Sequence, residues 1–249
     1  MEIKRRNFQG VLNILSFNRH FYVFGLIALA LIIGSKFVFV WPSYLYWIVI
    51  LGFMYGLLMP LIVSAYVYDL SGFYNFDWLR LMKLEDVKGK MNLNINAGFD
   101  ETSYIIESIL PQATLQVYDF YNSKQHTEPA IIRARKVSLV YPNTQQINSN
   151  SIPLDDNSVD NIFLISAIHE IRQHDERVQF LKECRRVCKP NGNVLMVEHL
   201  RDFPNFLAFT IGFAHFFSKQ TWKKAFEEAG FTSFTERKFT PFMSIFYCS

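Results

Sequence analysis

The sequence predicts an open α/β sheet with helices on both faces, preceded by two membrane-spanning helices. Three observations lead to this prediction. The 249-residue chain is unusually apolar, with 50% hydrophobic and only 19% charged residues, against about 25% charged in ordinary globular domains. Its longest apolar stretches lie before residue 69. After that point short apolar runs alternate with helical patterns, as in a parallel sheet with crossover helices.

Composition excludes several other classes of protein. The chain has ample apolar surface to bury, so disorder is not its main state. Three cysteines, an odd number in a long chain, exclude a disulfide scaffold. The net charge of +3 and the pI of 8.7 are mild, whereas nucleic-acid binders carry clustered basic stripes. We therefore expect no nucleic-acid partner.

The N-terminal region predicts a transmembrane helical hairpin over residues 21–68. Lys36 is the single formal charge in this stretch, and each pass needs about 20 apolar residues. Pro42 interrupts the stretch because proline cannot continue a helix interior, so we expect spans at residues 21–40 and 44–67. A cleaved signal peptide fits poorly, since its apolar core is only about 7–15 residues long. A buried helical hairpin of a soluble protein is the remaining alternative.

Basic residues set the expected orientation of the hairpin. Only Lys36 lies near the turn between the spans, whereas four basic residues precede the first span: Lys4, Arg5, Arg6 and Arg19. The positive-inside rule then places the N-terminus on the cytoplasmic side of the cell membrane, and two passes return the chain to that side. The expected organisation is a basic cytoplasmic segment (1–20), the hairpin (21–68), a juxtamembrane connector (69–90) and a cytoplasmic α/β domain (91–249).

The three cysteines would be reduced in that compartment. Cys184 and Cys188 are four residues apart on an expected helix and could touch one ligand. No further metal-type residue stands near them in the sequence, so packing is the better interpretation. The sequence shows no metal-ligand cluster, and we expect no metal.

The α/β domain is built of strands and helices that alternate. Strands are expected at residues 91–95, 114–118, 137–140, 161–166 and 193–197, with a last strand or pair within 232–247. Helices are expected at residues 102–110, 128–136, 175–188 and 221–229. Open sheets of this kind bind ligands beyond the carboxyl ends of their strands. The residues that follow the strands are therefore the candidates for function.

The first two strands are each followed by a candidate ligand-binding group. A turn containing Gly98 follows the first strand and lets the backbone approach a ligand closely. Asp119 follows the second strand, about 20 residues on, where a carboxylate accepts hydrogen bonds from ribose hydroxyls. Each has a simpler explanation: Gly98 would serve a turn in any fold, and Asp119 would cap a loop.

A longer stretch carries a family resemblance. Residues 151–197 read Ile-Pro-Leu-Asp-Asp-Asn-Ser-Val-Asp, then a strand ending in His-Glu-Ile, then Arg-Val-Cys-Lys-Pro-Asn-Gly. They resemble the L-P-F-x-D-x-S-F-D block and the R-V-L-K-P-G-G element of class I S-adenosylmethionine-dependent methyltransferases, of the type 11 kind. The resemblance covers residues 89–249. It implies a Rossmann-like methyltransferase sheet, S-adenosylmethionine as cofactor and S-adenosylhomocysteine as product.

The same resemblance assigns the cofactor site. The family's first motif reads acidic-x-G-x-G-x-G; here Asn94 stands at the acidic position, and Asn96, Gly98 and Asp100 stand at the glycine positions. Only the middle glycine is retained. Asp119 matches the ribose-binding acid, and Asn148 and Ser149 fall beside the adenine. The implied cofactor-binding set is Asn94, Asn96, Ala97, Gly98, Asp119, Phe120, Asn148, Ser149 and Ser166.

The methyl acceptor is expected beside the fourth and fifth strands. His169 and Glu170 follow the fourth strand, and Glu198 and His199 follow the fifth. In the family the first of these positions faces the acceptor. For a hydroxyl or phenol acceptor, His169 or His199 is the candidate general base, because imidazole titrates near neutral pH. Glu170 is a further catalytic candidate and Glu198 a substrate-binding one. A solvated strand end is the simpler explanation for His169 and Glu170.

An aromatic segment follows at residues 203–217, with six phenylalanines. Phe206, Phe209, Phe213 and Phe216 recur at three- and four-residue spacing, which places them on one helix face. The segment would line a pocket for an apolar acceptor, or dip into the bilayer interface, or simply pack in the core. His215 lies within it, as a packed histidine or at the mouth of a pocket.

Two functions of different classes remain open. The favoured one is a membrane-anchored methyltransferase for a hydrophobic acceptor that partitions into the bilayer, of lipid, quinone or aromatic-polyene type. The second is a degenerate methyltransferase fold that binds without catalysing, as a membrane-tethered interaction module; the losses of glycine at Asn96 and Asp100 motivate it. A nucleotide-dependent reductase is a weaker third.

Overall fold

The computed structural model describes residues 5–80, 89–125 and 128–249. Within these residues one seven-stranded sheet runs in the order β3-β2-β1-β4-β5-β7-β6, and all strands but β7 point the same way. The strands are β1 Met91–Asn96, β2 Thr114–Asp119, β3 Gln145–Gln146, β4 Val159–Ile165, β5 Cys188–His199, β6 Phe234–Thr240 and β7 Met243–Cys248. The predicted Rossmann-like sheet is thus confirmed.

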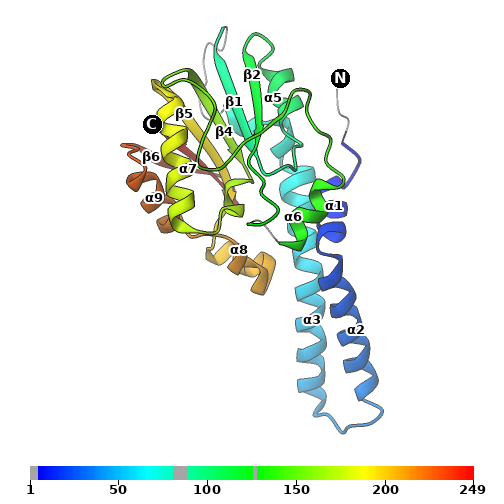
Figure 1. Ribbon diagram of the computed structural model, residues 1–249. Coiled ribbons are helices and arrows are strands. Elements are labelled where there is room, and N and C mark those ends of the chain that lie inside the picture. Colours follow the sequence, from blue (N-terminus) through cyan, green and yellow to red (C-terminus); the bar gives the residue numbers. More distant parts are fainter. Residues whose placement is uncertain (1–4, 81–88, 126–127) are drawn as a thin grey trace.

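Helices cover both faces of the sheet (Figure 1). On one face α7 and α9 bury Phe180 and Trp222 against the strands. On the other, α5 packs beside the base of the N-terminal helices. The domain helices are α5 Ser103–Ile109, α6 Pro129–Arg135, α7 His174–Val187, α8 Phe203–Phe209 and α9 Lys219–Glu228, with the 3-10 turns η3 Ile168–Glu170 and η4 Thr210–His215.

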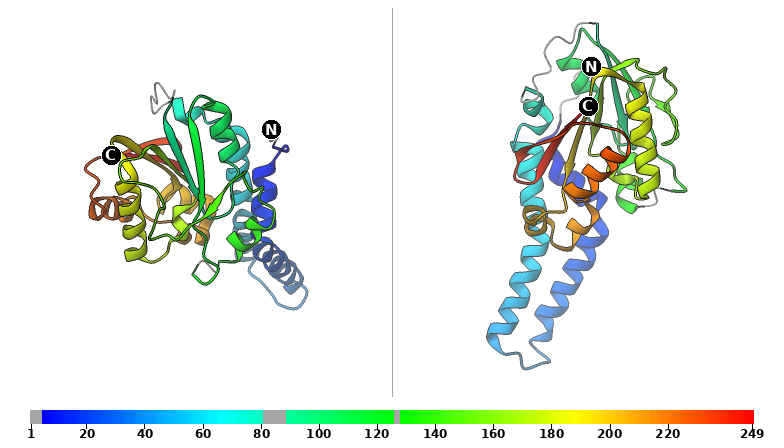
Figure 2. Two further views of the ribbon diagram at one scale, coloured as in Figure 1. Left: turned by 45° about the horizontal axis from the view of Figure 1, so that its top comes forward. Right: turned by 90° about the vertical axis from the view of Figure 1, so that its left-hand side faces the viewer.

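The N-terminal helices project from the domain as a pair joined at its far end (Figures 1 and 2). The pair consists of α2 Arg19–Ser35 and α3 Ser43–Ser64, and α1 Gln9–Phe17 precedes it. The π-helical turn η1 Ala65–Leu70, the 3-10 turn η2 Phe73–Asn75 and α4 Asp77–Arg80 follow. In the described chain, one stretch, Ser43–Asn75, is long and apolar enough by itself to cross a membrane. Helices α1 and α2 pass the same test only together, and they are bent by 77°. The two-span hairpin therefore stays a prediction.

The first helix of the pair ends earlier than the sequence predicts, at Ser35 rather than near Pro42. The Ser35 hydroxyl donates to the Ile32 carbonyl at 2.6 Å and accepts from the Trp41 indole at 3.0 Å. These bonds help to fix the turn before the proline is reached. Two other predicted segments fall partly outside the described residues: Lys4 of the basic segment and 81–88 of the connector.

The base of the pair is fastened to the α/β domain. The Asp69 carboxylate accepts from the backbone N–H of Gly10 at 2.8 Å, at the start of α1, where a carboxylate is favoured. Arg5 forms an ion pair of 2.7 Å with Glu101, in the turn after β1, and the Tyr74 hydroxyl donates to the same carboxylate at 2.6 Å. The N-terminal helices thus touch the region where a cofactor is expected.

Two sequence predictions about the elements are wrong. Residues 137–140 are not a strand; Val137 and Val140 are 59% and 75% exposed, and β3 comes later, at Gln145–Gln146. Val137 and its neighbours instead line a cavity of about 1190 Å³ beside α1 and α5. The aromatic segment is not one helix, because α8 ends where Thr210 takes a φ of 49°. Its phenylalanines therefore do not share one helix face.

Candidate functional site

The turn after β1 is held by the residues that replace two of the family's glycines. The Asn96 side-chain oxygen accepts from the Gly98 N–H at 2.7 Å. The Asp100 carboxylate accepts from the N–H groups of Thr102 and Ser103 at 2.9 Å, at the start of α5. Gly98 has a φ of +79°, which glycine adopts at little cost. The turn therefore keeps its shape by side-chain bonding.

Asp119 lies at the end of β2, opposite Asn96 in the sheet register, and is 7% exposed. One carboxylate oxygen accepts from the Tyr121 N–H at 2.8 Å and the other from Arg135 at 2.7 Å. The resemblance placed Asp119 beside the turn, and it lies there. A Cβ built on Gly98 would be 2.9 Å from the second of these oxygens.

Arg135, which the sequence did not single out, fills the space between Gly98 and Asp119. A Cβ on Gly98 would be only 1.2 Å from its Nη1. The same nitrogen donates to the Ala97 carbonyl at 3.0 Å, and the guanidinium lies 4.0 Å from the centre of the Tyr121 ring. Arg135 ends α6, far along the chain from the turn, so no motif spacing pointed to it.

Three buried polar atoms near this turn have no hydrogen-bond partner among the described residues: Asn94 Oδ1, Asn96 Nδ2 and Asp100 Oδ2. The Asn94 amide nitrogen donates to the hydroxyls of Thr102 and Ser103. Unsatisfied buried groups are costly, and they concentrate here around the turn with the positive φ. The residues present therefore fit a polar ligand.

The remaining cofactor candidates differ in their contacts. The Ser149 hydroxyl donates to Glu176 of α7 at 2.6 Å, and Asn148 Oδ1 accepts from the Asn150 N–H. Ser166 follows β4 with a φ of 48° and a buried hydroxyl without a partner in the described chain. The Phe120 side chain is 1% exposed and packs on Phe180 in the core, with ring centroids 5.4 Å apart, and its place in the cofactor site stays a prediction.

On the acceptor side, His169 lies between two buried carboxylates. Its Nδ1 is 2.8 Å from Glu198 Oε2 and its Nε2 is 3.5 Å from Glu170 Oε1. Burial alone would lower the pKa of His169, but the charges of Glu198 and Glu170 prevail and raise that pKa to about 10. The ring thus carries a proton at neutral pH. The general-base role of His169 stays a prediction, and it would need the ring to lose this proton first.

His215 joins this cluster from the aromatic segment. Its ring lies 5.1 Å from that of His169, and its Nδ1 is 3.0 Å from Glu128 Oε2. The hydrogen bond from His215 lowers the pKa of Glu128. One ligand atom from each of His169, Glu170 and His215 lies within 4.8 Å of the others. Glu128, before α6, was missed by the sequence reasoning.

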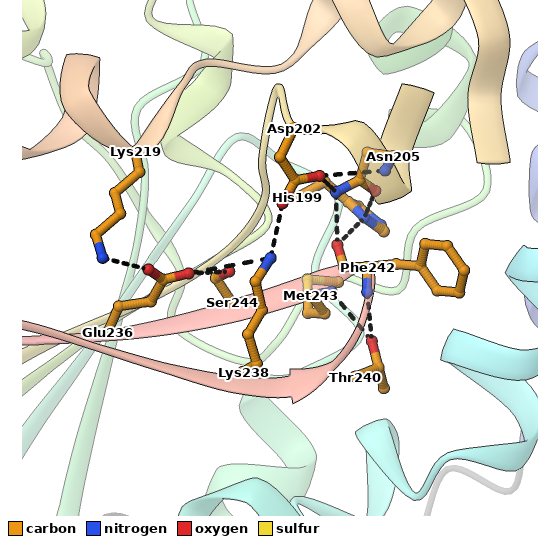
Figure 3. A network of polar contacts seen from close by, with 10 residues as sticks. All are labelled: His199, Asp202, Asn205, Lys219, Glu236, Lys238, Thr240, Phe242, Met243 and Ser244. Atoms are coloured by element: carbon orange, nitrogen blue, oxygen red, sulfur yellow. Dashed lines mark hydrogen bonds and ion pairs between the residues drawn. The ribbon is translucent and has the colours of Figure 1, made fainter. Parts of the chain in front are cut away.

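His199 is buried, and both of its ring nitrogens have partners. Figure 3 shows those of Nδ1. Its Nδ1 faces two acceptors, the Phe242 carbonyl at 2.8 Å and Asn205 Oδ1 at 3.1 Å, so it carries the hydrogen. Its Nε2 then accepts from the Tyr68 hydroxyl of η1 at 2.7 Å. Burial lowers the pKa of His199 to about 4. His199 is therefore neutral at neutral pH; its general-base role stays a prediction and would need Nε2 to give up its bond with Tyr68.

The predicted acceptor-side phenylalanines form two pairs. Phe209 and Phe216 pack on the ring of His199, at centroid distances of 5.2 and 4.9 Å. Phe206 packs on Phe213 at 5.1 Å and is 45% exposed. The segment also touches the apolar helix α3, since the Tyr55 hydroxyl donates to a backbone carbonyl of α8 at 2.6 Å.

Comparison with known proteins bears on the domain family and on the fold. Residues 102–196 match the family model described as a methyltransferase domain. A SAM-dependent methyltransferase from Aquifex aeolicus is similar in structure at 20% identity, over 76% of this chain and 97% of that chain, with a TM-score of 0.52. The PH0226 protein from Pyrococcus horikoshii is similar at 17% identity, over 73% and 91% of the two chains, with a TM-score of 0.53. These structures show the fold. A search of curated proteins finds no match.

Proposed function

We propose that the methyltransferase domain matched at residues 102–196 is of class I and uses S-adenosylmethionine, and that it methylates a hydrophobic acceptor held in the membrane that anchors the chain. One observation carries the proposal. The aromatic segment beside the acceptor-side cluster also packs on the exposed apolar helix α3. An acceptor dissolved in the bilayer, such as a lipid or quinone, would meet the site from that direction.

The turn after β1 and Asp119 would hold the cofactor, which supplies an electrophilic methyl group on a sulfonium. Asp119 is the group for the ribose hydroxyls, because its carboxylate faces the turn where Gly98 leaves room. Arg135 occupies that room and engages one Asp119 oxygen. Its side chain must therefore move for a ribose to bind there.

Proton removal from a hydroxyl acceptor falls to the cluster after β4. His169 is protonated and His199 is fully bonded, so neither imidazole is free to accept a proton. The Glu170 carboxylate is 6% exposed, and its Oε2 has no hydrogen-bond partner in the described ranges. We assign proton removal to Glu170.

Membrane anchoring rests on helix length and surface. The 22 residues of α3 and the 17 of α2 make helices of about 33 and 26 Å, close to the hydrocarbon thickness of about 30 Å. Both expose large apolar side chains, such as Phe24 at 68% and Ile48 at 62%. Arg5 and Arg6 precede them and Arg19 is the first residue of α2, which favours a cytoplasmic N-terminus and domain.

The test is calorimetric titration of the detergent-purified full chain with S-adenosylmethionine and S-adenosylhomocysteine. Micromolar binding of either is the expected result. Labelled methyl groups should then pass into the organic extract of membranes incubated with the protein, and the protein should stay in the membrane pellet after carbonate washing. No binding at millimolar ligand would overturn the proposal.

That negative outcome would support the second candidate, a membrane-tethered interaction module. Arg135 favours it specifically, because a guanidinium that fills the space beside Gly98 and pairs with Asp119 stabilises the fold without any ligand. The next experiment would then be cross-linking in the intact membrane to find partner proteins.

A further inference from the structure

We propose that His169, Glu170 and His215 bind a divalent first-row transition metal ion beside the acceptor. Each offers one ligand atom, and these atoms all lie within 4.8 Å of one another. Metal–ligand bonds of about 2.0–2.2 Å bring ligand atoms to within about 4 Å of each other. Small side-chain rotations therefore suffice to surround an ion.

Glu170 provides a second, independent observation. This carboxylate is 6% exposed, and of its two oxygens Oε2 meets no hydrogen-bond donor in the described part of the chain. A buried carboxylate oxygen without a donor is costly. A metal ion at the cluster would satisfy it, and would also offset the charge of Glu198, which is 2% exposed.

The partners of the two imidazoles match those of metal-bound histidines. Metal-ligating histidines usually donate their second ring N–H to a carboxylate or carbonyl, which fixes the tautomer. Here Nδ1 of His169 faces Glu198 at 2.8 Å, and Nδ1 of His215 faces Glu128 at 3.0 Å. Nε2 of each ring would then be the ligand atom, and at His169 the metal ion would displace the proton that this nitrogen carries. In His169 this nitrogen already faces Glu170.

Arg172 holds the two histidine segments together. Its Nη1 donates to the backbone carbonyl of His215 at 2.7 Å and to that of His169 at 3.2 Å. These ligands come from η3, after β4, and from η4, in the aromatic segment. Arg172 is thus a positioning residue: it fixes the spacing of the two imidazoles through their backbone and is not itself a ligand.

The ligand set selects the class of ion. Two imidazole nitrogens and one carboxylate suit zinc, iron, cobalt, nickel or manganese, whereas magnesium and calcium prefer oxygen ligands throughout. Such an ion would lower the pKa of a bound hydroxyl acceptor, which makes its proton easier to remove. This consequence rests on the proposed function; metal binding itself does not.

The experiment measures metal binding directly on the full chain in detergent. The protein is stripped with a chelator and titrated with Co²⁺, followed by its visible d–d absorption, and with Zn²⁺ by calorimetry. We expect one equivalent to bind. H215A and E170Q should each weaken binding by 10-fold or more, and E198Q by about 10-fold, as expected for an outer partner of a ligand.

His174→Ala is the matched control, because this histidine pairs with Glu228 at 2.8 Å on the surface, away from the cluster. It should bind the metal as the wild type does. Thermal unfolding of each variant shows whether it is folded. No bound metal, or wild-type affinity in folded E170Q and H215A, would overturn the site and leave an ion-pair network only. Cofactor titration separates the two proposals, since loss of S-adenosylmethionine binding with intact metal binding would overturn the proposed function alone.

Discussion

The two halves of the site are built differently. The cofactor half consists of the turn after β1 with Gly98, together with Asp119; these groups lie within 30 residues of one another in the sequence. The acceptor half consists of His169, Glu170, Glu198 and His215, which come from η3, β5 and η4. The first half is mainly backbone shape, and the second is a cluster of charged side chains. Each should therefore be breakable without the other.

The largest effect is expected in the acceptor half. Glu170→Gln keeps the shape of the side chain but removes its charge, so methyl transfer to a hydroxyl acceptor should slow by about 100-fold or more. The affinity for S-adenosylmethionine should stay within about twofold, because Glu170 lies outside the turn. Single-turnover rates and calorimetry measure the two quantities. Glu227→Gln, on the surface of α9, is the control. A parallel loss of cofactor affinity would show that the halves are not separate.

The reverse result is expected in the cofactor half. Asp119→Asn removes the charged acceptor for ribose hydroxyls, and a hydrogen bond to a charged group contributes about 1.5–3 kcal/mol. Affinity for S-adenosylmethionine should fall by about 10-fold or more. Asp156→Asn, whose carboxylate is 68% exposed, is the control. Unchanged affinity in the Asp119 variant would remove this residue from the site.

The same contrast explains how much the sequence could predict. Strands β1, β2 and β4 were placed to within two residues, because apolar and polar residues alternate in β1 and β2 and an apolar run fills the second half of β4, both of which are strand patterns. Gly98 and Asp119 followed from their positions after those strands. Residues 137–140 misled because three of the four are also apolar, yet residues 137–139 line a cavity instead of joining the sheet.

The acceptor half could not be assembled from sequence alone. His169 and Glu198 were identified as strand-end residues, but nothing in their spacing showed that they pair at 2.8 Å. Glu128 and Arg172 reach His215 only because the helices fold back over the strand ends. Tertiary packing decides such contacts, and it also decides the pKa of each histidine. An ordinary imidazole pKa could therefore not be assumed for His169 or His199, and their roles as bases stay predictions.

A smaller effect is expected where the N-terminal helices contact His199, beside the acceptor half. Tyr68→Phe removes the hydroxyl that donates to His199 Nε2 at 2.7 Å and leaves a buried acceptor unsatisfied. The loss should be about 1–2 kcal/mol of unfolding free energy, or roughly 2–8 °C in melting temperature for a chain of this size. Tyr66→Phe, on the same turn and 43% exposed, is the control. Equal melting temperatures would mean that this contact does not couple the two parts.

The smallest effect concerns Arg135, which links the cofactor half to α6. Its ion pair with Asp119 is 2.7 Å long, but its side chain is 28% exposed, and partly exposed pairs contribute only about 0–1 kcal/mol. Arg135→Ala frees both the Asp119 oxygen and the space beside Gly98, so affinity for S-adenosylmethionine should rise, by about threefold. Arg133→Ala is the control on the same helix, because Arg133 bonds to Phe17 and His20 instead. A fall in affinity of the Arg135 variant would reverse the assignment and make Arg135 a cofactor ligand. In that case the Arg135 guanidinium would contact the cofactor in the space beside Gly98. This contact would contribute more to cofactor affinity than the missing glycine at Asp100 takes away.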